Sequence, residues 1–160
     1  MIKTKLSGAQ DARAAIKKEI ARIAGGDNFV LVGFPEGSGS YDTGETIAGV
    51  AAANEFGTSR IPARPFLKNG VESGTAEYIA IIEDAAQAVT DGAINMTQVL
   101  EQIGLVAAGK VKEFMINLST PSNAESTVKR KKSSNPLIDT GAMVQAVTHV
   151  VTSEKPQEGI

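Results

Sequence analysis

Apolar residues near the N-terminus recur at the spacing of an amphipathic helix. Within residues 7–24, Ile16, Ile20 and Ile23 lie three and four positions apart, and basic side chains occupy positions between them. Because an α-helix has 3.6 residues per turn, this spacing places the three isoleucines on one face. Gly25 and Gly26 follow, and glycine tolerates the left-handed conformation of a helix end. The pattern therefore predicts a short N-terminal helix.

Two longer helical patterns occupy the middle of the chain, over residues 67–90 and 97–118. The second carries an apolar stripe at three-and-four spacing, and Asn95 with Gln98 forms a capping-box sequence in front of it. Since the link between the two segments is short, we expect them to pack antiparallel. An Ala-rich stretch over residues 46–55 predicts one more helix.

The remaining segments predict strands, loops and one extended arm. Residues 28–34 and 146–153 are apolar and β-branched, which is typical of strands. Residues 35–45 and 119–135 are polar and predict loops, and residues 154–160 predict a frayed tail. The extended arm is predicted over residues 56–67, FGTSRIPARPFL. This segment contains two prolines, each of which pushes the preceding residue into an extended conformation.

These elements predict one α+β domain over residues 1–160, ordered from about residue 7 to residue 153. We expect a small, mostly antiparallel sheet packed against two long antiparallel helices, with the short N-terminal helix added.

Composition excludes several classes of site. The chain has no cysteine and a single histidine, His149, so neither disulfides nor Cys- or His-rich metal sites are available. A formal net charge of -2 gives no global attraction to nucleic acid. No apolar run approaches the roughly 20 residues of a membrane span, and the N-terminus lacks the apolar core of a signal peptide. We therefore expect no cofactor, no metal and no membrane partner, and a protein kept in a cytoplasm-like compartment.

The strongest local charge is a basic run of Lys129, Arg130, Lys131 and Lys132. Such a run binds DNA phosphates without sequence preference by releasing counterions. No aromatic residues are interleaved with it, so a solvated loop or a patch facing an acidic partner is the favoured interpretation. DNA contact stays open as an alternative.

Asp-Thr-Gly occurs twice, at residues 42–44 and 139–141, and the second copy resembles the active-site strand of retroviral-type aspartic proteases. Two such turns in those enzymes bring together carboxylates that share one proton. The context differs, because this chain has long helical patterns and only 19 residues follow Gly141 (160 − 141 = 19). A turn and helix N-cap is the favoured interpretation, with a protease dimer as the alternative. We expect no catalytic residue in the chain.

Two blocks of sequence carry a more specific resemblance. The first is NEFGT at residues 54–58 followed by IPARPFL at residues 61–67. The second combines Ser126-Thr127 and Lys129–Lys131 with NPLIDTG at residues 135–141. In order and spacing, these blocks resemble the minor tail, tail-completion and neck proteins of tailed phages, a family also described as virion-morphogenesis proteins.

The resemblance implies a non-catalytic virion protein with a sheet backed by long helices. It implies homo-oligomeric ring subunits at the head–tail junction or tail end, with connector and tail-tube or terminator proteins as partners. For Arg64 and Phe66 two roles stay open: packing within the subunit, including an Arg64–Glu55 pair, or contact with a neighbour. The residues implied as structural or interface positions are Glu55, Phe56, Gly57, Ile61, Pro62, Arg64, Pro65, Phe66, Leu137, Asp139, Thr140 and Gly141.

Overall fold

The computed structural model describes residues 28–131 and 133–154. The predicted N-terminal helix, Lys132 and most of the predicted tail lie outside these residues. The described chain is a mixed helix-and-strand fold, in agreement with the predicted α+β class. Its elements in chain order are β1 (Phe29–Gly33), α2 (Ile47–Phe56), α3 (Phe66–Ser73), α4 (Thr75–Thr90), α5 (Met96–Asn117), α6 (Glu125–Lys131), α7 (Ala142–Ala146) and β2 (Thr148–Thr152).

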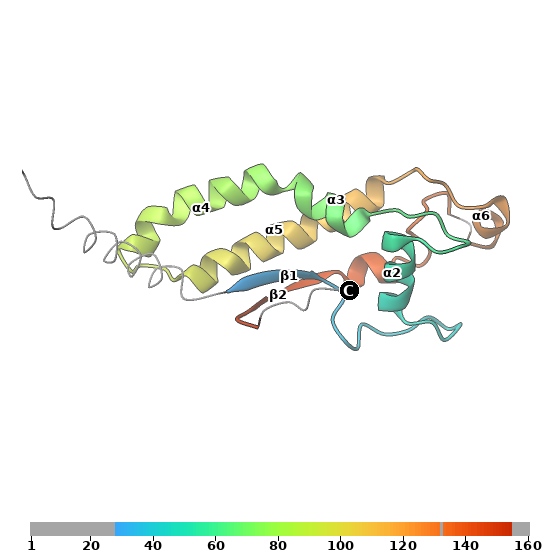
Figure 1. The fold of residues 1–160 in the computed structure, drawn as a ribbon, viewed down its shortest axis with the longest axis horizontal. Helices are drawn as coiled ribbons and strands as arrows, with labels where there is room; N and C mark the ends of the chain where they lie inside the picture. Colours follow the sequence, from blue (N-terminus) through green and yellow to red (C-terminus); the bar gives the residue numbers. More distant parts are fainter. Residues whose placement is uncertain (1–27, 132, 155–160) are drawn as a thin grey trace, which may run out of the picture.

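Helix α5 lies in the middle of a layered arrangement (Figure 1). Helices α3 and α4 run along one side of it, and the two-stranded sheet packs on another side. The strands β1 and β2 are antiparallel, with Leu31 opposite Val150 and Val32 opposite His149. Helices α2, α6 and α7 gather at the end of α5 that is distant from the α4–α5 link (Figure 1). Segments from both halves of the chain therefore meet at this end.

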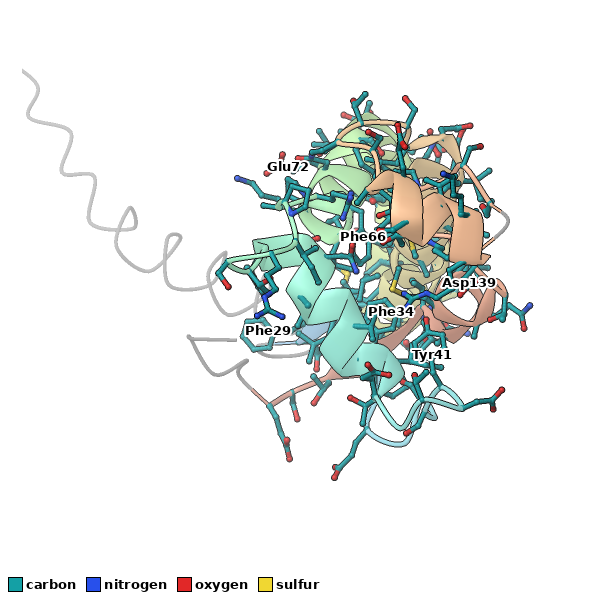
Figure 2. The ribbon with its side chains drawn as sticks, turned by 90° about the vertical axis from the view of Figure 1, so that its right-hand side faces the viewer. Phe29, Phe34, Tyr41, Phe66, Glu72 and Asp139 are labelled. Carbon is teal, nitrogen blue, oxygen red and sulfur yellow. The ribbon has the colours of Figure 1, made fainter. Side chains whose placement is uncertain are left out.

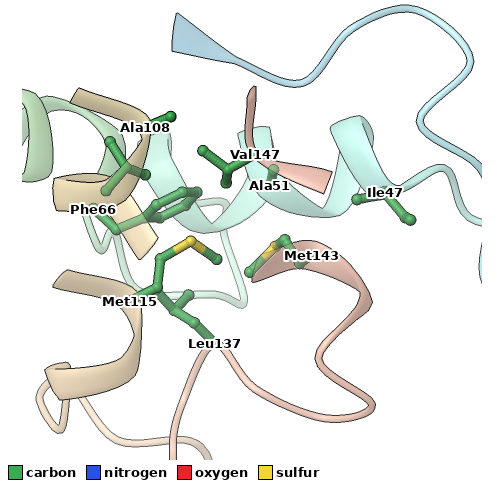
Figure 3. Packing of buried hydrophobic residues seen from close by; sticks show 9 residues of the cluster. Ile47, Ala51, Phe66, Ala108, Met115, Leu137, Met143 and Val147 are labelled. Atoms are coloured by element: carbon green, nitrogen blue, oxygen red, sulfur yellow. The ribbon is translucent and has the colours of Figure 1, made fainter. Parts of the chain in front are cut away.

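The main hydrophobic core lies at the same end and is centred on Phe66, which is fully buried. The Phe66 ring meets the Phe34 ring edge to face, with centroids 6.2 Å apart (Figure 2), and Phe34 is partly buried. Side chains from α2, α5, the 136–141 turn, α7 and the residue directly after α7 complete this core (Figure 3). They are Ile47, Ala51, Ala108, Val111, Met115, Leu137, Met143 and Val147.

A smaller cluster fixes the α4–α5 hairpin at the opposite end. Val89 of α4 and Val99 of α5 are buried there, and Ile94 packs against them. The predicted capping box is confirmed: the Asn95 side chain accepts from the Gln98 amide, and the Gln98 side chain accepts from the Asn95 amide. These paired bonds satisfy amides that the start of a helix leaves without intrahelical partners.

The predicted single helix over residues 67–90 is wrong, because the helix breaks at Gly74. Gly74 is buried between α3 and α4, and the Tyr78 hydroxyl donates to the Val71 carbonyl oxygen at 2.9 Å across the break. A Cβ on Gly74 would lie 2.3 Å from the Tyr78 hydroxyl oxygen. The tyrosine side chain thus lies over the glycine, and this local contact bridges the break between α3 and α4.

The C-terminal segments also differ from expectation. The predicted loop over residues 119–135 contains the short helix α6, and the predicted strand over residues 146–153 begins only at Thr148 because α7 occupies residues 142–146. Gly141, with φ of 85°, lies directly before α7. The side-chain oxygen of Thr140 accepts from the Ala142 amide at 3.3 Å. The second Asp-Thr-Gly therefore leads into a helix, as the favoured interpretation stated, but the N-cap residue is Gly141 and no side chain caps this helix.

Gly70 allows α3 to cross α5 closely, and this predicts a measurable effect. A Cβ on Gly70 would lie 2.7 Å from the Val111 Cα. Gly70→Ala should therefore lower the free energy of unfolding by about 2 kcal/mol, because the two backbones must separate. Gly109→Ala in α5 is the matched control, since nothing lies within 4 Å of a Cβ there. It should raise stability by about 0.5–1 kcal/mol in the same urea titration; equal effects at both sites would contradict the close crossing.

Candidate functional site

Arg64 is the centre of a buried polar network. Its side chain is 2% exposed, although it ends in a guanidinium group. Nε donates to the Pro121 carbonyl oxygen at 2.7 Å, and Nη1 donates to Asn54 Oδ1 at 2.8 Å. Nη2 donates to the Ser122 carbonyl oxygen and to Asn123 Oδ1, each at 3.1 Å. Arg64 thus holds the end of α2 against the chain that follows α5.

All four acceptors of Arg64 are neutral oxygens. Burial lowers the pKa of Arg64 from its ordinary value. An arginine stays charged even so, and its planar fork of donors suits several fixed acceptors at once. The network therefore compensates a buried charge with dipoles, and removing the guanidinium would leave several acceptors unpaired.

Asn54, the last buried residue of α2, makes the other half of this connection. Its backbone oxygen accepts from the Arg64 amide at 2.6 Å, and its side-chain nitrogen donates to the Val50 carbonyl oxygen at 2.9 Å. Asn54 therefore contacts Arg64 through both its backbone and its side chain, which fixes how the extended arm returns to α2.

Asn135 ties the second sequence block to α5. Its side-chain nitrogen donates to the carbonyl oxygens of Met115 and Ile116, at 3.1 and 2.8 Å. Its Oδ1 accepts from the amides of Leu137 and Ile138, at 2.8 and 3.0 Å. This turn places Leu137 in the main core, where the residue is 4% exposed.

Asn123 links the two blocks directly. Its Oδ1 accepts from Arg64, while its side-chain nitrogen donates to the Pro136 carbonyl oxygen at 3.2 Å. The Lys131 ammonium also donates to the Pro136 carbonyl oxygen, at 3.1 Å. The two sequence blocks, with 58 residues between them (125 − 67 = 58), are thus parts of one hydrogen-bonded unit.

The suggested Arg64–Glu55 pair is wrong. Glu55 instead accepts from the amides of Leu67 and Lys68 at the start of α3, at 2.8 and 3.1 Å. Those amides lack intrahelical partners and carry the positive end of the helix dipole, which favours a carboxylate there. Arg64 faces the other way, into the Asn54–Asn123 network.

This role of Glu55 predicts a moderate loss of stability on substitution. Glu55→Ala should lower the free energy of unfolding by about 1 kcal/mol, because two helix-end amides lose their acceptor. Glu55→Gln keeps one acceptor oxygen and should cost less. Glu72→Ala, at the exposed other end of α3, is the control and should change stability by less than about 0.5 kcal/mol in denaturant unfolding. A larger loss for Glu72→Ala than for Glu55→Ala would refute the assignment.

The other residues of the arm mostly shape the backbone. Gly57 has φ of 75°, and a Cβ there would lie 2.9 Å from the Ala63 backbone nitrogen. The Ile61 carbonyl oxygen accepts from the Thr58 amide at 2.8 Å, which closes the turn before the prolines. Pro62 and Pro65 are exposed, and Phe56 has 67% of its surface exposed. Of the two aromatic residues in the first block, only Phe66 belongs to the core.

An open cavity of about 520 Å³ borders the Arg64 network. Asp42 and Asp139, from the two Asp-Thr-Gly triplets, both line it, together with Arg60 and Arg130. Burial, and secondarily the charge of Asp139, raises the pKa of Tyr41 at this cavity. Charges of both signs line the cavity, so its walls do not favour a ligand of one charge.

The structure brings both triplets to one cavity, but their setting is that of turns. Asp42 and Asp139 are both exposed, and neither directly follows a strand. Gly44 has φ of 93°, and Thr43 donates to the carboxylate of Glu45. A two-stranded sheet in the described chain also differs from the all-β scaffold that supports the protease dyad.

The basic run is divided between two environments. Lys129 and Arg130 are exposed on the last turn of α6, whereas Lys131 is partly buried in the Asn123–Asn135 network. Burial lowers the pKa of Lys131. A partner can therefore be met by Lys129 and Arg130, while Lys131 serves the fold.

His149 has a structural setting on the inner face of the sheet. Its Nε2 lies 2.9 Å from Glu101 Oε2, and its ring lies against Gly104 of α5. Over residues 28–131 and 133–154, no group of three or more His, Cys, Asp or Glu side chains is arranged to hold a metal ion. No helix within those same ranges has the length and apolar character to cross a membrane.

Comparisons with protein-family models, with curated proteins and with solved structures gave no match. The assignment of function therefore rests on the sequence blocks and on the geometry described above.

Sequence reasoning missed the asparagines of the network as site residues: Asn54, Asn123 and Asn135. Asn135 precedes a proline, and such pairs favour turn initiation, so a signal for its role was present. Asn123 carries no such signal, because its partners Arg64 and Pro136 are 59 and 13 residues away.

Proposed function

We propose that this chain is a structural subunit of a tailed-phage particle, acting in the neck, at the head–tail junction or in tail completion. The observation that carries the proposal is the meeting of the two resembling blocks. They form one buried network around Arg64 and Asn123 and one core around Phe66. Residues placed in this way specify a fold, which suits a family whose common property is architecture and not a reaction.

The layered arrangement supports the same proposal. A small antiparallel sheet backed by α5, with α3 and α4 behind it, is in keeping with the sheet and long helices of that family. Among the site residues, none forms the nucleophile–base pair that covalent catalysis requires.

The distribution of exposed apolar residues supports assembly into a ring. Ile79 and Ile82 of α4 are 51% and 48% exposed, while Leu105 of α5 is 67% exposed. Copies that associate head to tail need two different surfaces on each subunit, and the interface repeats until the rotation closes. We propose that α4 contributes one of these surfaces and that the partners above and below are connector and tail proteins.

A mass measurement tests the ring. We expect the chain, mixed with the connector protein encoded with it, to form a complex whose mass corresponds to several copies. Ile79→Glu with Ile82→Glu should weaken this assembly by on the order of tenfold or more, because charge replaces apolar contact at the interface. Gln87→Glu, a polar exposed position of α4, is the matched control and should assemble normally.

Circular dichroism of the free variants separates assembly from folding, since all three positions are exposed. Equal assembly of the double variant and the control would contradict the role of α4. A connector that never binds the wild-type chain would contradict the proposed function itself.

A further inference from the structure

The outer face of α4 carries apolar side chains around one acidic side chain. Ile79 and Ile82 are 51% and 48% exposed, and Glu83 and Ala86 are exposed as well. These four positions are spaced three and four residues apart, so they share one face of the helix. Within residues 28–131 and 133–154, the ion pairs do not include Glu83. The α4 face therefore offers apolar area together with a carboxylate that can pair with a cation.

The open cavity described above has a complementary composition. Its walls include the aliphatic groups of Val50, Ile61 and Pro62, and the exposed cations Arg60 and Arg130 also line it. Neither of these arginines forms an ion pair with another residue of the described chain. With a volume of about 520 Å³, the cavity can take up an aliphatic side chain while its cations meet a carboxylate beside it.

The α4 face and the cavity lie in different parts of the subunit. The cavity is bordered by α2, the arm, α6 and the 136–141 turn, at the end of α5 that is distant from the α4–α5 link (Figure 1). Helix α4 runs along α5 toward that link. A subunit therefore cannot bring its own α4 face to its own cavity, whereas a second copy of the chain can do so.

We propose that the cavity is the second surface of the ring interface and receives Ile79 and Ile82 from the α4 face of the next copy. Glu83 of that copy lies against Arg60 and Arg130. Contact between two different surfaces is heterologous, and it repeats from copy to copy until the rotation closes. This inference deepens the proposed ring assembly and rests on it.

A helix face fits this cavity better than a free anion does. Asp42 and Asp139 also line the cavity, so a free anion would meet like charges as well as cations. On the α4 face the carboxylate is held in one position between apolar side chains, which can cover the aliphatic walls. Burial of these apolar groups is favourable, and arginine is a residue type enriched at protein interfaces.

Disulfide trapping between two differently tagged chains tests this contact, because the natural chain contains no cysteine. One chain carries Ala86→Cys on the α4 face, and the other carries Ala124→Cys at the cavity. This mixture should form a heterodimer on the order of tenfold faster than a mixture with Ala80→Cys in place of Ala86→Cys. Ala80 is exposed and lies about 120° around the helix from Ala86, so it is the matched control.

Charge reversal tests the part played by Glu83 with the same readout. Glu83→Lys added to the Ala86→Cys chain should slow heterodimer formation about tenfold, because like charges then face each other. Arg130→Glu added to the Ala124→Cys chain should restore part of the rate. Asp84→Lys, at an exposed position about 100° around α4 from Glu83, is the control and should leave the rate unchanged. The reaction of each thiol with a small disulfide reagent corrects the rates for local charge.

Equal rates for the Ala86→Cys and Ala80→Cys mixtures, or no slowing by Glu83→Lys, would overturn the inference. Disulfide-linked dimers formed by the Ala86→Cys chain alone would also overturn it, because two α4 faces would then meet each other. Binding of the wild-type chain to the connector separates this outcome from the proposed function. A connector complex that forms without the heterodimer would refute only the contact between α4 and the cavity.

Discussion

Arg64→Ala is expected to lower the free energy of unfolding by about 2–4 kcal/mol, a large part of the stability of a domain this size. The substitution removes the donors that satisfy Asn54, Pro121, Ser122 and Asn123. It leaves the buried Asn54 Oδ1 and three partly buried oxygens without this donor. Chemical denaturation of the purified variant, followed by circular dichroism, measures this loss.

Two further variants separate charge from geometry at Arg64. Arg64→Lys keeps the charge but lacks the planar fork, so it should still lose about 2 kcal/mol. Arg64→Met keeps much of the side-chain length without donors and should fall near Arg64→Ala. If Arg64→Lys were as stable as the wild type, the charge alone would matter and the network of separate acceptors would not.

Phe66→Ala is expected to lower the free energy of unfolding by about 3–5 kcal/mol, through lost apolar burial and the cavity left behind. Phe66 is fully buried and contacts residues from both halves of the chain, so the cavity would open at the junction of α2, α5 and α7. Thermal or urea unfolding measures the effect, and Phe66→Leu should lose less because it fills part of the space.

Phe56→Ala is the matched control, since it removes the other aromatic ring of the same sequence block. Phe56 is 67% exposed, so its replacement should change stability by less than about 0.5 kcal/mol. Equal losses at positions 56 and 66 would contradict the placement of the core.

Both large effects have the same consequence for the proposed function. Arg64 and Phe66 act within the subunit, so their replacement should block particle completion by depleting folded protein. The soluble amount of each variant should fall together with the yield of complete particles. Normal soluble levels with blocked completion would instead indicate that these side chains contact a neighbour.

The sequence predicted those helices and strands whose signals act over only a few neighbouring residues. The capping box at Asn95 and the apolar spacing after it predicted α5, and the Ala-rich stretch predicted α2. The β-branched runs predicted both strands, although not the register that pairs Leu31 with Val150. Register depends on which face is buried, and that depends on α5.

The elements that were missed depend on side-chain contacts that helical and strand periodicity do not encode. The break at Gly74 follows from where Tyr78 lies, and helical periodicity carries no information on that contact. Helix α7 lies between the NPLIDTG block and β2, which were both recognised from the sequence. The Met143 side chain of α7 packs in the main core. Tertiary packing decides such short helices more than propensity does.

Some residues of the candidate site were predicted from the sequence, but its asparagines and its connections were not. A pair between Arg64 and Glu55 was one of the possibilities left open, yet Arg64 binds Asn54 and a loop nearly 60 residues away. Leu137 was recognised from the second block, whereas Asn135, which places it, was not. Hydrogen bonds across long sequence separations need the folded chain to be recognised.

Cryo-electron microscopy of purified particles encoded together with this chain is the most direct test of the proposed role. We predict density at the head–tail junction or tail end that accommodates α3, α4, α5 and the sheet in each member of a ring, and mass spectrometry of the same particles should detect the chain. Complete, infectious particles that lack the chain would contradict the account.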